Sequence, residues 1–151
     1  MKYLLLALFL LVSCNKPKVE KINVYSAGAE YDLTSGTGSY YTLIDGSNIE
    51  KKKIAFFIPK SDLESIKKEY YSSGLDTVNK DIDFESTENY STIYGKRSLL
   101  IKLTLNNGKT QQIGYSGAIA SAPKEVKGFL TRIYGTCNRI KDSLHLRPHT
   151  W

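Results

Sequence analysis

Beyond the N-terminal 20 residues, two serines stand three residues before a lysine, a spacing that lets a lysine activate a serine nucleophile at a helix start. The pairs are Ser65 with Lys68 and Ser121 with Lys124. Ser65 falls on the polar face of a predicted helix, and Ser121 is explained as part of a helix entry. Because neither pair is joined by the further motifs of Ser/Lys hydrolases, we predict no catalytic residue and keep such a hydrolase as an alternative.

The two histidines, His145 and His149, lie in a C-terminal segment that also contains Pro148. A catalytic histidine needs a fixed hydrogen-bonding partner, and chain ends seldom provide one. A spacing of four residues suits two metal ligands on one helix face, but Pro148 argues against a continuous helix there. We therefore predict neither a metal site nor a cofactor.

Side chains with oxygen ligands alternate with apolar ones between residues 79 and 85. The oxygen-bearing residues are Asn79, Asp81, Asp83 and Glu85. Calcium takes six to eight oxygen ligands, but the glycine that a calcium loop needs at its middle is missing here. The alternation favours instead a strand with one apolar and one acidic face. The three acids are then candidates for binding a partner.

Tyrosine dominates the aromatic residues, with 11 Tyr against 5 Phe and 1 Trp. A tyrosine ring offers a large contact area at a small cost in conformational entropy, which suits binding surfaces. Two adjacent pairs occur, Tyr40 with Tyr41 and Tyr70 with Tyr71. In each pair we expect one ring to face the core and the other to face solvent. All four are candidates for contacting a partner, although packing alone explains them equally well.

Strands and two helices must position these residues. Strands are predicted around residues 22–25, 40–44, 54–58, 79–85, 98–105 and 110–115, with a hairpin turn at Asn106-Asn107-Gly108-Lys109. The first helix is expected to begin with a capping box at residues 61–64 and to stop at Gly74. The second begins at Pro123 and is expected to stop at Gly135. The only lysine triplet, residues 51–53, is expected in a solvated loop.

This order of elements predicts an α+β fold, in which an antiparallel sheet of about five or six strands has two helices packed on one face. Strands and helices do not alternate regularly, which argues against a parallel α/β sheet. The length suits one domain with a modest core. We expect a single domain over residues 21–140 and a C-terminal tail over 141–151.

The N-terminus carries one lysine, Lys2, ahead of an apolar run over residues 4–12 that meets Ser13 and Cys14. This is the layout of a signal peptide, and the run is shorter than the roughly 20 residues that a transmembrane helix needs. The segment Leu11-Val12-Ser13-Cys14 resembles the lipobox of bacterial lipoproteins. An ordinary secretory signal that ends near a cysteine is the alternative.

The lipobox resemblance implies that residues 1–13 are removed and that Cys14 becomes a lipid-modified first residue. Residues 14–20 then form a tether to the membrane. Position 15 is Asn rather than Asp, which favours the outer membrane, with the domain facing the periplasm. The order of elements also resembles a group of small uncharacterised bacterial lipoprotein domains. That resemblance implies no function.

The net charge of +6 is spread along the chain, and an export signal places the protein away from nucleic acid, so we expect no nucleic-acid partner. If Cys14 is lipidated, Cys137 is left alone, either to pair between chains or to be buried. We expect a non-enzymatic envelope lipoprotein that binds a protein, such as an immunity protein neutralising a toxin delivered to the periplasm. The alternative is a structural or accessory lipoprotein of an envelope complex.

Overall fold

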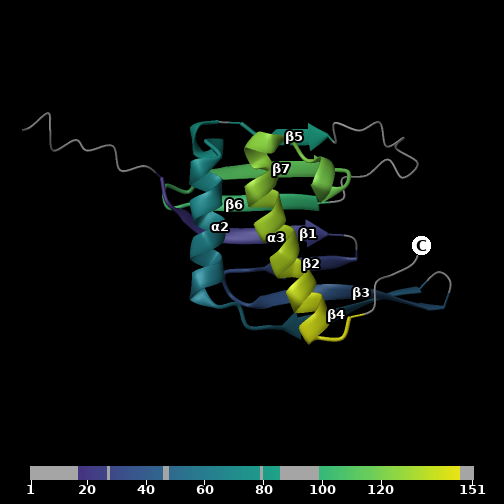
Figure 1. Ribbon diagram of the computed structural model, residues 1–151. Coiled ribbons are helices and arrows are strands. Elements are labelled where there is room, and N and C mark those ends of the chain that lie inside the picture. Colours follow the sequence, from purple (N-terminus) through teal and green to yellow (C-terminus); the bar gives the residue numbers. More distant parts are fainter. Residues whose placement is uncertain (1–16, 27, 46–47, 79, 86–98, 147–151) are drawn as a thin grey trace, which may run out of the picture.

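The computed structural model describes residues 17–26, 28–45, 48–78, 80–85 and 99–146 (Figure 1). This part of the chain forms one sheet, two α-helices and two short 3-10 helices. The strands are β1 (Val19–Ser26), β2 (Ala29–Asp32), β3 (Thr37–Asp45), β4 (Asn48–Ala55), β5 (Ile82–Glu85), β6 (Leu99–Leu105) and β7 (Thr110–Ser116). The helices are α2 (Lys60–Ser72), η1 (Leu75–Thr77), η2 (Ile119–Ser121) and α3 (Lys124–Ser143).

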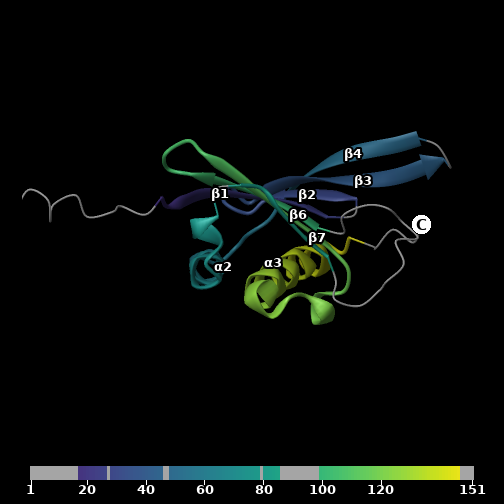
Figure 2. The same ribbon diagram turned by 90° about the horizontal axis from the view of Figure 1, so that it is seen from above.

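The seven strands lie in the order β4-β3-β2-β1-β6-β7-β5. All neighbours are antiparallel except β5, which runs parallel to β7. Both α-helices cover the same face of this sheet (Figure 2). The predicted α+β class is confirmed, whereas the sheet is mixed and has more strands than the five or six that we expected.

The lysine triplet lies inside strand β4, so the prediction of a loop there is wrong. Strand β4 is an edge strand that pairs with β3 alone. Lys51, Lys52 and Lys53 are exposed along it. An edge strand can carry more polar residues than a central strand. Lysines on an edge strand also disfavour backbone pairing with strands of other chains. The triplet is therefore compatible with a strand in this position.

The core lies between the sheet and the two α-helices. Residues of β1, β6 and β7 point into it, with Val24, Ile101 and Ile113 fully buried. Helix α3 contributes an apolar stripe at helical spacing. The stripe consists of Val126, Phe129, Leu130, Ile133, Cys137 and Ile140.

The predicted stop of the second helix at Gly135 is wrong, because α3 continues to Ser143. A glycine inside a helix costs only about 1 kcal/mol relative to alanine. Full burial of one side chain such as Ile140, which is 3% exposed, contributes roughly 1.5–3 kcal/mol. Packing of the last two turns therefore outweighs the glycine, and the helix extends past the domain boundary predicted at residue 140.

Helix α2 begins one residue before the predicted capping box. Pro59 occupies the N-cap position and no side chain caps the helix, so Ser61 lies within the first turn. The predicted stop is confirmed, because α2 ends at Ser72 and Gly74 adopts a left-handed conformation with φ of 71°. No helix in the part of the chain described is both long and apolar enough to cross a membrane.

The folded structure starts within the predicted tether. Strand β1 begins at Val19, which is 4% exposed and belongs to the hydrophobic core. Val19 pairs with Leu105 of β6, and the chain before it is held by the β6–β7 hairpin, where the backbone N–H of Asn106 donates to the carbonyl of Lys18. The first strand is therefore longer than the apolar residues at 22–25 predicted.

Candidate partner-binding surface

The sheet face opposite the α-helices is left uncovered by any described helix (Figure 2). Strand pairing decides which side chains point to this face, because directly paired residues lie on the same side of a sheet. Ser39, for example, pairs with Glu30 and Lys53, and Glu30 pairs with Tyr25. We call this surface the open face. Its polar side chains include Lys21, Asn23, Tyr25, Glu30, Asp32, Ser39, Tyr41, Lys51, Lys53, Asp83, Lys102 and Gln112.

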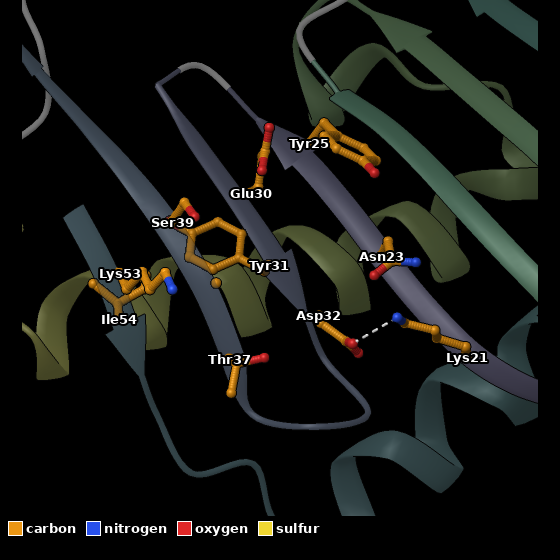
Figure 3. A pocket seen from close by; sticks show the side chains of 11 residues that line it. Lys21, Asn23, Tyr25, Glu30, Tyr31, Asp32, Thr37, Ser39, Lys53 and Ile54 are labelled. Carbon is orange, nitrogen blue, oxygen red and sulfur yellow. Dashed lines mark ion pairs between the residues drawn. The ribbon is translucent and has the colours of Figure 1, made fainter. Parts of the chain in front are cut away.

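A hollow of about 410 Å³ lies on the open face over strands β1 to β4 (Figure 3). Lys21 and Asp32 point toward one another across β1 and β2, and Lys21 Nζ lies 3.0 Å from Asp32 Oδ2. Tyr25 and Lys53 also line the hollow, whereas Ser39 lies at its floor and is 9% exposed. The hollow thus offers an aromatic ring, a hydroxyl and charges of both signs.

The carboxylate of Asp32 is fixed by several contacts. Besides Lys21, the backbone N–H groups of Thr34 and Ser35 donate to Asp32 Oδ1 at 3.1 and 3.2 Å. Burial by itself opposes ionisation, but the hydrogen bonds from Lys21 and Ser35 outweigh it and hold the pKa of Asp32 below its ordinary value. Asp32 is therefore a charged, oriented group at neutral pH.

A second cluster on the open face joins β2, β3 and β4. The hydroxyl of Tyr41 donates to Glu30 Oε1 at 2.8 Å, and Lys51 Nζ donates to Glu30 Oε2 at 3.2 Å. Lys51 Nζ also lies 5.2 Å from the centre of the Tyr41 ring. Hydrogen bonds with Tyr41 and Glu30 raise the pKa of Lys51. These three side chains constrain one another in the free protein, so they lose less conformational entropy when a partner binds.

Charges of both signs are interspersed on the open face. Its lysines are Lys21, Lys51, Lys53 and Lys102, and its acids together with those at its β5 edge are Glu30, Asp32, Asp81 and Asp83. Lys21 and Lys51 form ion pairs, whereas Lys53 and Lys102 have no carboxylate partner in the described ranges. A polyanion such as nucleic acid needs a surface of one sign. A mosaic of this kind fits a folded protein better.

The structure separates the predicted tyrosines as expected, with one buried and one partly exposed member in each pair. Tyr40 is 7% and Tyr70 2% exposed, so both are core residues and neither is available to a partner. Tyr41 lies on the open face. Tyr71 lies elsewhere, beside the start of β1, where its hydroxyl donates to the carbonyl of Pro17 and accepts from the backbone N–H of Val19.

The predicted acidic strand is confirmed in part: β5, which forms the other edge of the sheet, spans only Ile82–Glu85, so Asp81 lies just before it. Ile82 and Phe84 pack against the core, whereas Asp81 and Asp83 are exposed. Asp81 Oδ1 accepts a hydrogen bond from the backbone N–H of Gln112 at 2.8 Å. The side chain of Glu85, and all of Asn79 and Cys14, lie outside the described residues.

The residues at the centre of the open face were missed as site candidates. In β1 the sequence alternates Lys21, Asn23 and Tyr25 with Ile22 and Val24, and this period of two was a usable signal for a polar face. No comparable signal exists for Lys53 or Glu30, because only the pairing of β2, β3 and β4 brings them beside Tyr25.

The residues considered for catalysis lie on or beside the two α-helices. Ser65 and Lys68 lie on α2, and Ser121 closes η2 just before α3. No group of three histidine, cysteine or acidic side chains in the described ranges is placed to hold a metal ion. His145 is exposed after α3, and His149 lies outside those ranges.

Cys137 is buried within α3. Burial was one of the two alternatives that we predicted for it. It is 2% exposed and forms no disulfide. Burial raises the pKa of its thiol to about 12, so the reactive thiolate is scarce at neutral pH. Cys137 therefore serves as a small apolar core residue rather than a nucleophile.

Comparison with known proteins adds no functional constraint. No protein-family model matches this chain, and no curated protein matches it significantly. Function must therefore be inferred from the sequence and from the geometry of the open face.

Proposed function

We propose that the protein is a lipoprotein of the cell envelope, anchored through Cys14, whose open face binds another protein without catalysing a reaction. One observation carries this proposal. No helix of the described residues covers the open face, and its side chains Glu30, Tyr41 and Lys51 are already held in place by one another. Such preorganised polar groups beside an exposed aromatic ring are characteristic of binding surfaces.

Tyr25 and Lys53 are the residues on which we expect binding to depend most. Tyr25 is 38% exposed and lies among polar side chains, and a tyrosine in such a position buries a large area when a partner covers it. Lys53 lies three strands away on the same cross-strand row, about 14 Å at the usual spacing between strands. We infer that the partner places an acidic side chain against Lys53.

A toxin delivered into the periplasm is the partner that we favour, which makes the protein an immunity protein. The lipid anchor and the absence of a predicted catalytic residue support this version. It is tested by deleting the gene together with a neighbouring toxin-like gene and challenging the mutant with the parent strain. Reduced survival, restored by the intact gene, is expected. Unchanged survival would remove the immunity version and leave a structural or accessory lipoprotein, which the identity of the partner would distinguish.

Site-specific photo-crosslinking tests the open face itself. Tyr25 and Tyr134 are exposed to similar extents, 38% and 45%, but Tyr25 lies on the open face and Tyr134 on helix α3. Each is replaced by a photoreactive phenylalanine in the full chain expressed in its own cells. We expect a discrete crosslinked product from position 25 and none from position 134. The same product from both positions, or from neither, would contradict the proposed surface.

The lysine triplet supplies a matched charge test. Lys53 lines the hollow on the open face, whereas Lys52 pairs with Tyr40, points to the other face and lies 3.3 Å from Glu50. We expect Lys53→Glu to weaken the crosslink at position 25 at least tenfold, since a like charge then meets the partner's acid. Lys52→Glu, with the same change of net charge one residue away, should leave it unchanged. Equal effects would show that only net charge matters.

A further inference from the structure

The folded domain holds its own N-terminal connection at two points. The hydroxyl of Tyr71 on α2 lies 3.1 Å from the carbonyl oxygen of Pro17 and 2.9 Å from the backbone nitrogen of Val19. On the other side, Asn106 in the β6–β7 hairpin bonds Lys18 twice, through its side-chain oxygen and its backbone N–H. The chain is therefore attached to the domain by hydrogen bonds from Pro17 onward.

A groove runs beside this attachment point, between the start of β1 and helix α2. Glu64, Lys67, Lys68 and Tyr71 line it at the helical spacing of one face. Lys18 and Glu20 line it from β1 and the residues before it, and its volume is about 870 Å³. We call it the tether groove. Three lysines and two glutamates face it, so it carries a small excess of positive charge.

Pairing within the tether groove leaves particular charges available. Lys67 Nζ lies 3.2 Å from Glu64 Oε1, whereas Lys18 and Lys68 form no ion pair in the described part of the chain. Two ammonium groups, with Glu20 as the remaining acid, thus flank the point where the chain leaves the domain. This combination suits phosphate groups, since ammonium groups form charge-assisted hydrogen bonds with phosphate oxygens.

The length of chain before the groove limits how far it can lie from a bilayer. Lys18 lies four positions after Cys14, and an extended chain spans at most about 3.6 Å per position, so the distance is at most about 14 Å. A lipid on Cys14 would hold that residue at the headgroup layer. The far end of β1, at Ser26, lies about 23 Å further along the strand at the usual rise per residue.

We propose that the tether groove rests on the membrane and that Lys18 and Lys68 bind the phosphates of phospholipid headgroups. This inference rests on the proposed lipidation of Cys14. The lipid supplies one attachment and the groove a second, and two attachments fix the tilt of the domain. The end that carries the groove then faces the bilayer. Figure 1 shows that the β6–β7 hairpin lies at the same end of the sheet as the start of β1, so the opposite ends of β1 and β7 point away from the bilayer.

Fluorescence quenching in vesicles tests this orientation. The full lipidated chain is purified from membranes and placed in vesicles of phosphatidylethanolamine and phosphatidylglycerol that contain a headgroup-attached quencher. One variant carries a fluorophore on Ser72→Cys, one helical turn after Lys68, and the other carries it on Ala120→Cys in η2. Because η2 follows β7, it lies about 20 Å from the hairpin end at the usual strand rise. Cys137 is buried and escapes labelling.

We expect strong quenching at position 72 and little at position 120. Reversing both groove charges with Lys18→Glu and Lys68→Glu should release the groove while the lipid keeps the protein on the vesicle. Two lysines at an anionic surface favour the bound state by roughly 30-fold, so quenching at position 72 should fall to near that at 120. High salt should act in the same direction. The control, Lys124→Glu with Arg132→Glu on exposed positions of α3, changes net charge equally and should have no effect.

The outcomes separate this inference from the proposal beneath it. If the protein carries lipid and stays on the vesicles, but positions 72 and 120 are quenched equally or the charge reversal changes nothing, the groove contact is wrong and the anchor stands. If a labelled lipid precursor is incorporated equally into the wild type and Cys14→Ala, the lipidation of Cys14 is wrong, and the orientation falls with it.

Discussion

Replacing Gln111 should destabilise the fold, because its side chain connects three separate elements inside the core. Gln111 is 5% exposed. Its oxygen accepts from the hydroxyl of Tyr70 on α2 at 2.8 Å. Its Nε2 donates to the carbonyls of Leu75, Val78 and Lys80, at 3.1, 2.8 and 3.3 Å. One amide thereby holds the connection from α2 to β5 against β7.

The expected cost of Gln111→Leu follows from these contacts. Leucine fills a similar volume but removes the acceptor of a buried hydroxyl and the donor to three carbonyls. Leaving the Tyr70 hydroxyl without a partner costs about 1–3 kcal/mol, and the hydrogen bonds that the two amide N–H groups share among the three carbonyls contribute about 2 kcal/mol. The additional apolar burial of leucine returns about 1 kcal/mol. We expect a net loss of about 3 kcal/mol in the free energy of unfolding.

Urea unfolding followed by circular dichroism measures this loss on the mature chain with Cys14→Ser. Tyr70→Phe is the companion variant, which removes only the hydroxyl. Because the two side chains form one hydrogen bond, the double variant should be less destabilised than the separate losses predict, with a coupling energy of about 1–2 kcal/mol. A Gln111→Leu variant within about 0.5 kcal/mol of wild type, or an additive double variant, would refute this account of the network.

Four further substitutions test other features of the fold. Tyr71→Phe removes the hydroxyl that holds the start of β1, and should lower the free energy of unfolding by about 1–2 kcal/mol and speed amide exchange there. Gly38→Ala places a Cβ against the carbonyl oxygen of Glu30 and should cost more than about 3 kcal/mol in thermal unfolding. Gly135→Ala, where nothing obstructs a Cβ, should instead gain up to about 1 kcal/mol. Burial raises the pKa of Cys137 from 9.0 to about 12; since the folded state favours the neutral thiol, its contribution to stability should be full below pH 9 and lost as pH rises to 12. Cys137→Ala should flatten that part of the pH profile.

Much of the fold was predictable because hydrophobic periodicity reports burial directly. The stripe of α3 and the alternation in β6 both have the period of their element. The failures occur where tertiary packing overrides a local signal. Gly135 by itself indicates a helix stop, but burial of the residues after it keeps the helix going. The lysines of β4 by themselves indicate a loop, but backbone pairing with β3 makes them part of a strand.

The parallel pairing of β5 with β7 was not predictable for a related reason. Between these strands lie β6 and a stretch of chain long enough to permit several placements. Only the contacts of Ile82 and Phe84 with the core decide which edge β5 joins. The acidic face of β5 followed from its alternation, but its position on the same sheet face as Tyr41 depends on the complete strand order.

The tyrosines show why composition alone does not identify a binding surface. Among the tyrosines in the described ranges, four are buried in the core: Tyr31, Tyr40, Tyr70 and Tyr115. Two of these hydroxyls bind within the fold, Tyr70 to Gln111 and Tyr115 to the carbonyl of Ala118. A ring with a polar tip suits these positions because it fills space and ties a loop or neighbouring element at the same time. The abundance of tyrosine therefore reports packing as much as recognition.

Tyr25 and Tyr41 differ from the buried tyrosines because their positions in the strand register place them on the open face. The tether groove lies at one end of the strands, whereas the open face extends along their length. With that end held at the bilayer, the hollow beside Tyr25 lies to the side of the domain rather than beneath it. A periplasmic partner can then cover Tyr25 and Lys53 without displacing lipid. Loss of the groove contact should consequently alter the orientation of the domain but leave the crosslink at position 25 intact.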